Sequence, residues 1–171
     1  MSSREELLRL LEPPAEKTAP LSPDEIARGY GSSLPADFIW FGEVYGSGAI
    51  ADYLTVLAPV PADEVGAGPG AAPMTAEQFV DFDGGDEIDP AYLEPGGLVA
   101  WGTNPNNDVA FFSPVGDPES WPIVIRRHNP RSGPIWARYD CGFAEFLLRT
   151  FRGELAENPF SGEGLWRNEA P

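Results

Sequence analysis

The chain has 171 residues, with 11 Lys and Arg against 27 Asp and Glu, so its formal net charge is −16. This acidity argues against a duplex nucleic-acid binder and against an anionic membrane surface, because both require basic side chains. The apolar share of 42% suits one domain with one core, and the single cysteine excludes an internal disulfide and a multi-cysteine zinc site.

Two short helices are predicted near the N-terminus. Ser3-Arg-Glu-Glu6 has the form of a capping box, and the helix that it begins ends before Pro13-Pro14. Ser22-Pro23-Asp24-Glu25 begins the next helix with a cap, a proline at the first helical position and a glutamate that can reach back. This second helix ends near Gly29 or Gly31.

A third helix is predicted to open at Leu34-Pro35. Phe38, Phe41 and Tyr45 recur at helical spacing, which gives this helix an apolar face. Gly46 suits the left-handed backbone conformation that often follows the last turn of a helix.

Strands and loops are predicted for the middle of the chain. Residues 49–58 are rich in Ile, Leu, Val, Tyr and Thr and predict a strand. Residues 61–73 form a flexible loop by composition, and a brief helix is predicted over residues 75–82. Residues 81–89, DFDGGDEID, form an acidic loop.

Two hairpins and a closing helix are predicted in the remainder. The first hairpin joins residues 98–103 to 109–113 through a turn at 104–108, and the second joins 121–128 to 135–139. The last helix runs from Cys141 or Gly142 to Arg152, with Asp140 as its cap. Its predicted buried face consists of Phe143, Phe146, Leu147 and Phe151.

This order of elements predicts an α+β fold, with an antiparallel or mixed sheet meander and helices packed on one face in a single domain. Residues 1–21 are assigned to an N-terminal helix and linker, 22–153 to the domain, and 154–171 to an irregular tail. No apolar run approaches the roughly 18 residues of a membrane span, and the N-terminus is too charged for a signal peptide. We therefore expect a cytoplasmic protein.

The negative charge is concentrated in one part of the chain. Residues 1–120 hold 21 acids and 4 bases, whereas residues 121–171 hold 6 acids and 7 bases. Between Arg28 and Arg126 lie 97 residues with 15 acids and no Lys, Arg or His. This stretch serves either solubility alone or attraction of a basic partner.

The acidic loop and one tryptophan are the candidate partner-binding residues. A calcium site in the loop is disfavoured, because its spacing fails the EF-hand pattern at positions five and twelve and lacks the turn glycine. Trp40 lies to one side of the apolar face of its helix, where a partly exposed tryptophan can anchor an interface. The candidates are Trp40, Asp81, Asp83, Asp86, Glu87 and Asp89.

Little in the sequence indicates catalysis or a bound cofactor. Cys141 is the only thiol and His128 the only imidazole, and no flanking motif makes them a nucleophile and base. Cys141 lies at a helix start that can lower its pKa, but a small buried side chain is the favoured role. We expect no enzyme activity, no metal and no cofactor.

Four motifs in order resemble the SUKH superfamily, the cell-wall-regulator-like and bacterial immunity protein family. They are Leu-Pro leading through a helix to aromatic-Gly-x-Gly, a Trp-Gly strand end, a Trp-x-Ile/Val strand, and a closing Phe-x-x-Phe-Leu helix. The resemblance covers residues 22–153. The matching residues are Leu34, Pro35, Phe38, Tyr45, Gly46, Gly48, Trp101, Gly102, Trp121, Phe146 and Leu147.

The resemblance implies an α+β fold and a non-enzymatic protein-binding role, and it implies that the matching residues are mainly structural. Bacterial members of the family are mostly immunity proteins that bind and block a toxin of a polymorphic-toxin system, often a nuclease. A basic toxin partner is therefore expected, with this chain a monomer or weak dimer. The alternative is a regulatory or scaffolding module without a toxin partner.

Overall fold

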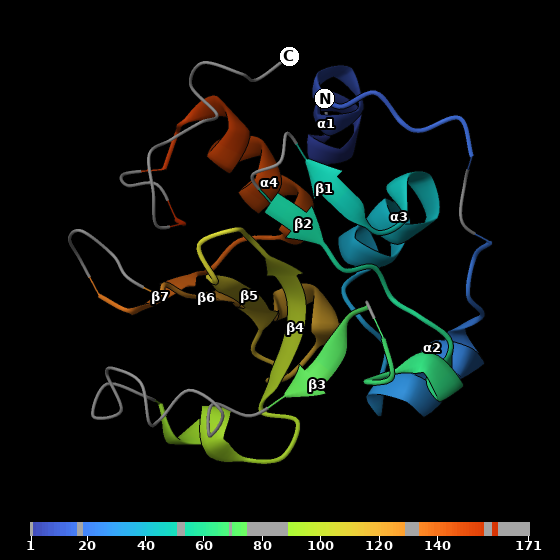
Figure 1. Ribbon diagram of the computed structural model, residues 1–171, viewed down its shortest axis with the longest axis vertical. Coiled ribbons are helices and arrows are strands. Elements are labelled where there is room, and N and C mark those ends of the chain that lie inside the picture. The colour runs from blue at the N-terminus through green and yellow to red at the C-terminus, as the bar shows by residue number, and fades with distance from the viewer. Residues whose placement is uncertain are drawn as a thin grey trace.

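The computed structural model describes most of the chain (Figure 1). The described residues are 2–16, 19–50, 54–68, 70–74, 89–128, 134–155 and 159–160. The α-helices among them are α1 (Ser3–Leu10), α2 (Pro23–Tyr30), α3 (Ala36–Tyr45) and α4 (Phe143–Arg152), and the 3₁₀ helices are η1 (Ala62–Glu64), η4 (Pro90–Leu93) and η5 (Pro118–Ser120). The strands are β1 (Gly48–Ile50), β2 (Leu54–Val56), β3 (Ala72–Met74), β4 (Leu98–Thr103), β5 (Val109–Phe112), β6 (Ile123–Arg126) and β7 (Trp136–Tyr139).

These strands form one seven-stranded sheet in which every pairing is antiparallel. The order is β1-β2-β4-β5-β6-β7, and β3 also pairs with β4. β2 pairs with the end of β4 at Gly102 and Thr103, and β3 pairs with its beginning at residues 98–100. The predicted α+β fold is therefore confirmed, with the antiparallel form of the sheet.

The start of α1 shows how local side chains set a helix boundary. The Ser2 hydroxyl accepts the Glu5 backbone N–H at 3.3 Å, and the Glu5 carboxylate accepts the Ser2 backbone N–H at 2.8 Å. This is a capping box one residue earlier than the Ser3 box that the sequence predicted.

The other helix boundaries agree with the sequence in part. Ser22 caps α2 through the Glu25 backbone N–H at 3.2 Å, as predicted. Gly31 ends this helix with a φ of 78°, a conformation that glycine adopts without steric cost. The predicted Asp140 cap of α4 is wrong: Gly142 occupies the cap position, and Asp140 instead accepts a hydrogen bond from the Arg138 guanidinium at 2.9 Å.

The predicted turn between β4 and β5 is held by its own asparagine. The Asn104 side-chain oxygen accepts the backbone N–H groups of Asn106 and Asp108, both at 3.0 Å. Its amide group donates to the Asp108 carboxylate at 2.9 Å. Asn107 adopts a φ of 64°, which asparagine tolerates better than most residues.

The main core lies between the helices and one face of the sheet, as predicted. α1, α2, α3 and α4 each contribute buried side chains to it, and Trp101 is fully buried at an irregularity of the β4–β5 pairing. The centroids of the Phe38 and Phe112 rings lie 5.1 Å apart, and those of Trp101 and Phe143 lie 4.9 Å apart. Each such buried side chain contributes about 1.5–3 kcal/mol through burial. Leu7 brings α1 into this core, although the sequence assigned residues 1–21 to a separate segment.

The opposite face of the sheet carries a second, smaller apolar cluster. Leu98, Ala100, Phe111 and Val124 are buried there, and Tyr92 of η4 packs against them. Trp136 of the edge strand β7 stacks on Phe111 with ring centroids 6.1 Å apart. The sheet is therefore apolar on both faces, although the α-helices cover only one.

The single strand predicted over 49–58 is wrong, because β1 and β2 form a hairpin in which Ile50 pairs with Leu54. The loop predicted over 61–73 instead contains η1 and the beginning of β3. The helix predicted over 75–82 lies outside the described residues, as does the whole segment 129–133 between the two strands of the second predicted hairpin.

Candidate functional site

Trp40 is half-buried on α3 and is covered on one side by Arg4 of α1. The guanidinium carbon of Arg4 lies 5.5 Å from the centroid of the Trp40 ring, a distance that allows a cation–π interaction. The Arg4 Nε also donates to the Asp37 carboxylate at 2.6 Å. A partner that used Trp40 as an anchor would therefore meet this tryptophan together with a paired arginine.

The predicted acidic loop is described only at its end. Asp81, Asp83, Asp86 and Glu87 lie outside the described residues. Asp89 is exposed and caps η4, and its carboxylate accepts the Ala91 backbone N–H at 2.9 Å. Asp89 therefore has a structural role beside any partner-binding one.

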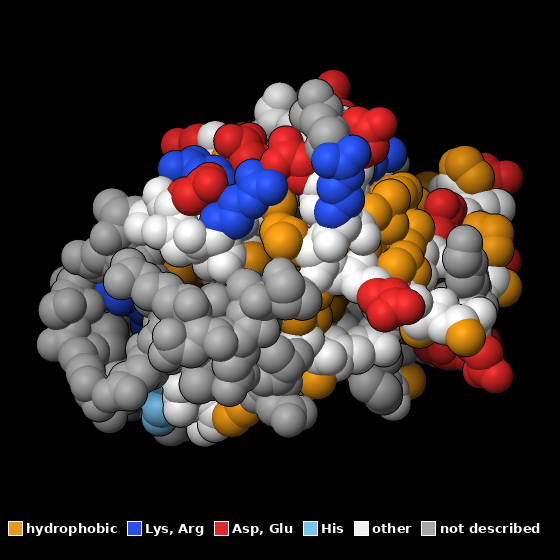
Figure 2. Space-filling view, turned by 90° about the horizontal axis from the view of Figure 1, so that it is seen from above, with side chains coloured by type: hydrophobic (Ala, Val, Ile, Leu, Met, Phe, Trp, Pro, Cys, Tyr) orange, Lys and Arg blue, Asp and Glu red, His pale blue; other side chains and the backbone are white. Residues whose placement is uncertain are grey.

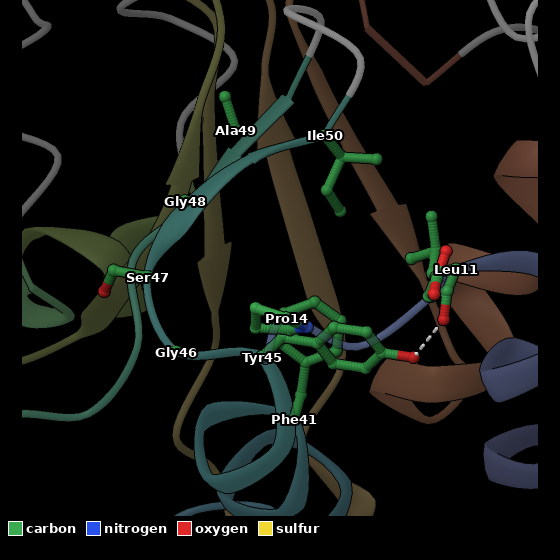
Figure 3. Close-up of a pocket in the computed structure, with 10 residues that line it drawn as sticks. Leu11, Pro14, Phe41, Tyr45, Gly46, Ser47, Gly48, Ala49 and Ile50 are labelled. Carbon is green, nitrogen blue, oxygen red and sulfur yellow. Dashed lines mark hydrogen bonds between the residues drawn. The ribbon is translucent and has the colours of Figure 1, made fainter. Parts of the chain in front are cut away.

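A pocket of about 420 Å³ lies between the end of α3, the segment that follows α1, and β1 (Figure 3). This volume falls within the range of small-ligand and side-chain pockets. Phe41 and Tyr45 form its base, and the Ile50 side chain points into it from β1. The lining residues are Leu11, Glu12, Pro14, Phe41, Tyr45, Gly46, Ser47, Gly48, Ala49 and Ile50.

One hydrogen bond fixes the base of the pocket. The Tyr45 hydroxyl donates to the Leu11 carbonyl at 2.9 Å, which attaches the end of α3 to the segment after α1. Burial raises the pKa of the Tyr45 hydroxyl, so it stays protonated and keeps its proton for this bond. Ser47 points away from the pocket and accepts the Ala58 backbone N–H at 2.8 Å.

β1 forms one edge of the sheet and lies along the pocket. The Leu57 backbone N–H donates to the Trp101 carbonyl, so in β2 the main-chain groups of Thr55 face β4 and those of Leu54 and Val56 face β1. Because Ala49 pairs with Thr55, the N–H and C=O of Ala49 point away from β2, to the side of β1 on which the described sheet has no further strand.

The charges of the described surface are unevenly distributed. Basic and acidic side chains are mixed in the upper part of Figure 2, and Arg152 of α4 pairs with Glu6 of α1 at 2.6 Å. The right-hand side of this view shows carboxylates and apolar side chains. Glu43, Asp63 and Glu64 are exposed and take part in no ion pair within the described residues.

Cys141 lacks the properties of a nucleophile. Burial, with a smaller contribution from the nearby Glu145 carboxylate, raises the pKa of the Cys141 thiol to about 11, so the reactive thiolate is scarce at neutral pH. The favoured role of Cys141 as a small buried side chain agrees with this half-buried position, and the alternative of a pKa lowered by the helix start does not hold.

His128 lies two residues after the end of β6, close to the polar side chains of Asp108 and Arg126. Its backbone N–H donates to the buried Asp108 carboxylate at 2.8 Å, and its ring Nδ1 lies 3.4 Å from an Arg126 nitrogen. Asp108 thereby joins the β4–β5 turn to the end of β6. The buried Asp108 carboxylate therefore accepts hydrogen bonds from the Asn104 amide of the turn and from the His128 backbone.

Most residues that carry the family resemblance are buried. Leu34, Pro35, Phe38, Trp101, Gly102, Trp121, Phe146 and Leu147 are all buried. A side-chain carbon on Gly102 would lie 3.3 Å from the Ala110 side chain, so this glycine permits close strand packing. The Trp121 indole donates to the Gly116 carbonyl at 3.0 Å.

The aromatic-Gly-x-Gly motif departs from this purely structural pattern. Gly46 has a φ of 69°, which requires glycine, but Gly48 is exposed and lines the pocket together with Tyr45. The sequence predicts a structural role for these residues and does not indicate the pocket. The only available signal was an aromatic helix end joined to a short strand by glycines.

Among the described residues, no group of three or more His, Cys, Asp and Glu side chains could hold a metal ion. No helix in the described part of the chain is long and apolar enough to cross a membrane.

Comparisons with protein-family models, with curated proteins and with solved structures gave no match. The resemblance to the SUKH superfamily therefore remains a prediction from the sequence motifs.

Proposed function

We propose that the chain is a non-enzymatic protein-binding module, and specifically an immunity protein that binds and neutralises a basic toxin, such as a nuclease. One observation carries the proposal: the 97 residues between Arg28 and Arg126 contain 15 acids and no cation. In this proposal the protein acts in the cytoplasm as a monomer or weak dimer.

The described part of this stretch supports the proposal through its unpaired carboxylates. Glu43, Asp63, Glu64 and Glu94 are exposed, and no Lys or Arg of the described chain pairs with them. A nuclease holds phosphates in a basic site, and an acidic protein can imitate that charge. Attraction of this kind raises association rates roughly 10- to 1,000-fold at low ionic strength.

Apolar contacts have to supply much of the affinity, because exposed ion pairs contribute about 0–1 kcal/mol each. Trp40 is the proposed anchor, since partly exposed tryptophans often account for a large share of binding energy. The acidic loop, with Asp81, Asp83, Asp86, Glu87 and Asp89, is proposed to steer the basic partner toward the complex.

The test is co-expression with the product of the neighbouring gene. If that product is a toxin, we expect this protein to restore growth and to co-purify with it. An unrelated acidic protein of similar charge is the control and should leave the toxin active. Unchanged toxicity in the presence of this protein would contradict the immunity function and leave the regulatory or scaffolding alternative.

A further inference from the structure

Two features of the α1–α3–β1 region point to the same kind of ligand. The first is the open edge of β1, where Ala49 presents a backbone donor and acceptor that no strand of the described sheet uses. Exposed strand edges of this kind bind extended peptides by adding a strand.

The second feature is the pocket of about 420 Å³ beside that edge. Side chains alternate across a strand, so Gly48 and Ile50 face the pocket side and Ala49 faces the other. A strand added to β1 would also alternate, and one of its side chains would point toward Phe41, Tyr45 and Ile50. Gly48 leaves room for this side chain, because a Cβ placed there meets no heavy atom within 4 Å.

We infer that β1 and this pocket bind an extended segment of a partner protein that carries an apolar residue with a Lys or Arg close to it. The segment adds a strand at Ala49 and places its apolar side chain in the pocket. This inference deepens the proposed function and rests on it only in taking a basic protein as the partner.

The charge of the pocket decides which occupant fits. Glu12 is exposed and takes part in no ion pair within the described chain, and among the described residues that line the pocket it is the only charged one. A neighbouring Lys or Arg of the bound segment would complement it. A second copy of the chain fits less well, because each copy carries a net charge of −16 and the copies repel one another.

The test uses a displayed random library of nine-residue peptides selected on the whole chain. We expect the enriched peptides to share an apolar residue with a Lys or Arg within two positions, and to bind in an extended conformation. Enrichment of acidic peptides, or of no common pattern, would overturn the inference.

Variants of β1 then identify the site. Ala49→Pro removes the outward N–H without touching the bonds to β2, and Gly48→Leu fills the pocket. Each should weaken peptide binding at least about tenfold, the equivalent of one main-chain hydrogen bond. The control Gly68→Leu adds the same side chain outside the pocket, at a position where a Cβ meets no heavy atom within 4 Å, and should bind normally. Thermal unfolding of all three variants confirms that they are folded.

A charge variant tests the choice of partner. Glu12→Gln should weaken binding of the selected peptides a few-fold at low salt and not at high salt, whereas Glu16→Gln, which lies outside the pocket, should not.

If Ala49→Pro alters the oligomeric state of the chain and not peptide binding, the occupant is a second copy and the inference is wrong. Peptide binding without toxin neutralisation would overturn the immunity function alone. If the Ala49→Pro and Gly48→Leu variants neutralise the toxin as well as the wild type does, the proposed binding site at β1 is wrong and the immunity function stands.

Discussion

The Tyr45 hydroxyl donates a hydrogen bond of 2.9 Å to the Leu11 carbonyl, 34 residues earlier in the chain. This bond joins the last residue of α3 to the residue that follows α1. It also closes the base of the pocket beside β1. The same tyrosine therefore belongs to the fold and to the proposed binding site.

Tyr45→Phe tests this relationship. The variant keeps the ring in the core and leaves the Leu11 carbonyl without its donor, so unfolding free energy should fall by about 0.5–1.5 kcal/mol. Urea unfolding followed by tryptophan fluorescence measures the change. Tyr45→Leu removes the ring as well and should cost clearly more. An unchanged midpoint for Tyr45→Phe would show that the bond does not stabilise the protein.

Gly97→Ala should be one of the more damaging small substitutions. A Cβ at Gly97 would approach the Ala91 carbonyl oxygen far inside contact distance, and this atom belongs to the backbone of η4. The chain between η4 and β4 has to shift, at a cost of about 1–3 kcal/mol. Gly68→Ala is the matched control, because a Cβ there meets nothing within 4 Å. Equal melting temperatures for the two variants would refute this packing.

The raised pKa of Cys141 predicts slow thiol chemistry. With a pKa of about 11, against an ordinary value of 9.0, the thiolate fraction at pH 8 is about a hundredfold lower than in an exposed cysteine. Alkylation by iodoacetamide should be slower by about the same factor and should speed up toward pH 11. Denatured protein supplies the reference rate. A native rate equal to that reference at pH 8 would contradict the burial of the thiol.

The same pKa has a consequence for stability. The folded state holds the Cys141 proton more tightly than the unfolded state, so the stabilising contribution is complete below pH 9 and is lost as the pH rises toward 11. Cys141→Ser lacks this titration. Its unfolding free energy should therefore decline less than that of the wild type between these pH values.

Trp40→Ala should separate anchoring from folding. If Trp40 anchors the proposed partner, its loss should weaken the complex by about 2 kcal/mol or more, which is roughly thirtyfold in affinity. Trp40→Phe keeps an aromatic face for Arg4 and should lose less. Calorimetric titration against the partner gives both affinities. An unchanged affinity for Trp40→Ala would remove this residue from the binding surface.

Neutralising the acidic loop should act on the rate of association. The variant with Asp81, Asp83, Asp86, Glu87 and Asp89 changed to their amides should associate more slowly, and its rate should depend less on salt. Stopped-flow mixing at several ionic strengths measures both effects. A control variant with Glu163 and Glu169, near the C-terminus, changed to glutamine tests whether a loss of negative charge elsewhere in the chain also slows association. Identical rates for wild type and loop variant would exclude the loop from steering.

The sequence by itself determined the features that depend on neighbouring residues. Ser22 and Gly31 mark the ends of α2 because caps act on backbone groups within one turn. Asn104 marks the β4–β5 turn for the same reason. The strands of Trp101, Phe112 and Ile123 were recognisable from their apolar residues, but the neighbouring Ala100, Phe111 and Val124 are apolar as well, so the sequence could not tell which face the helices cover.

Tertiary structure decided the features that join distant segments. The alternation in residues 49–58 is the same for one strand as for a hairpin, so only pairing with β4 separated β1 from β2. The pocket exists because Leu11, Tyr45 and Ile50 come together from three elements. The pairing of β2 with β4 determines that the main-chain N–H and C=O of Ala49 face away from β2. The sequence could locate the charge and the core, but the free edge and the pocket beside it required the fold, since both are defined by what packs next to them.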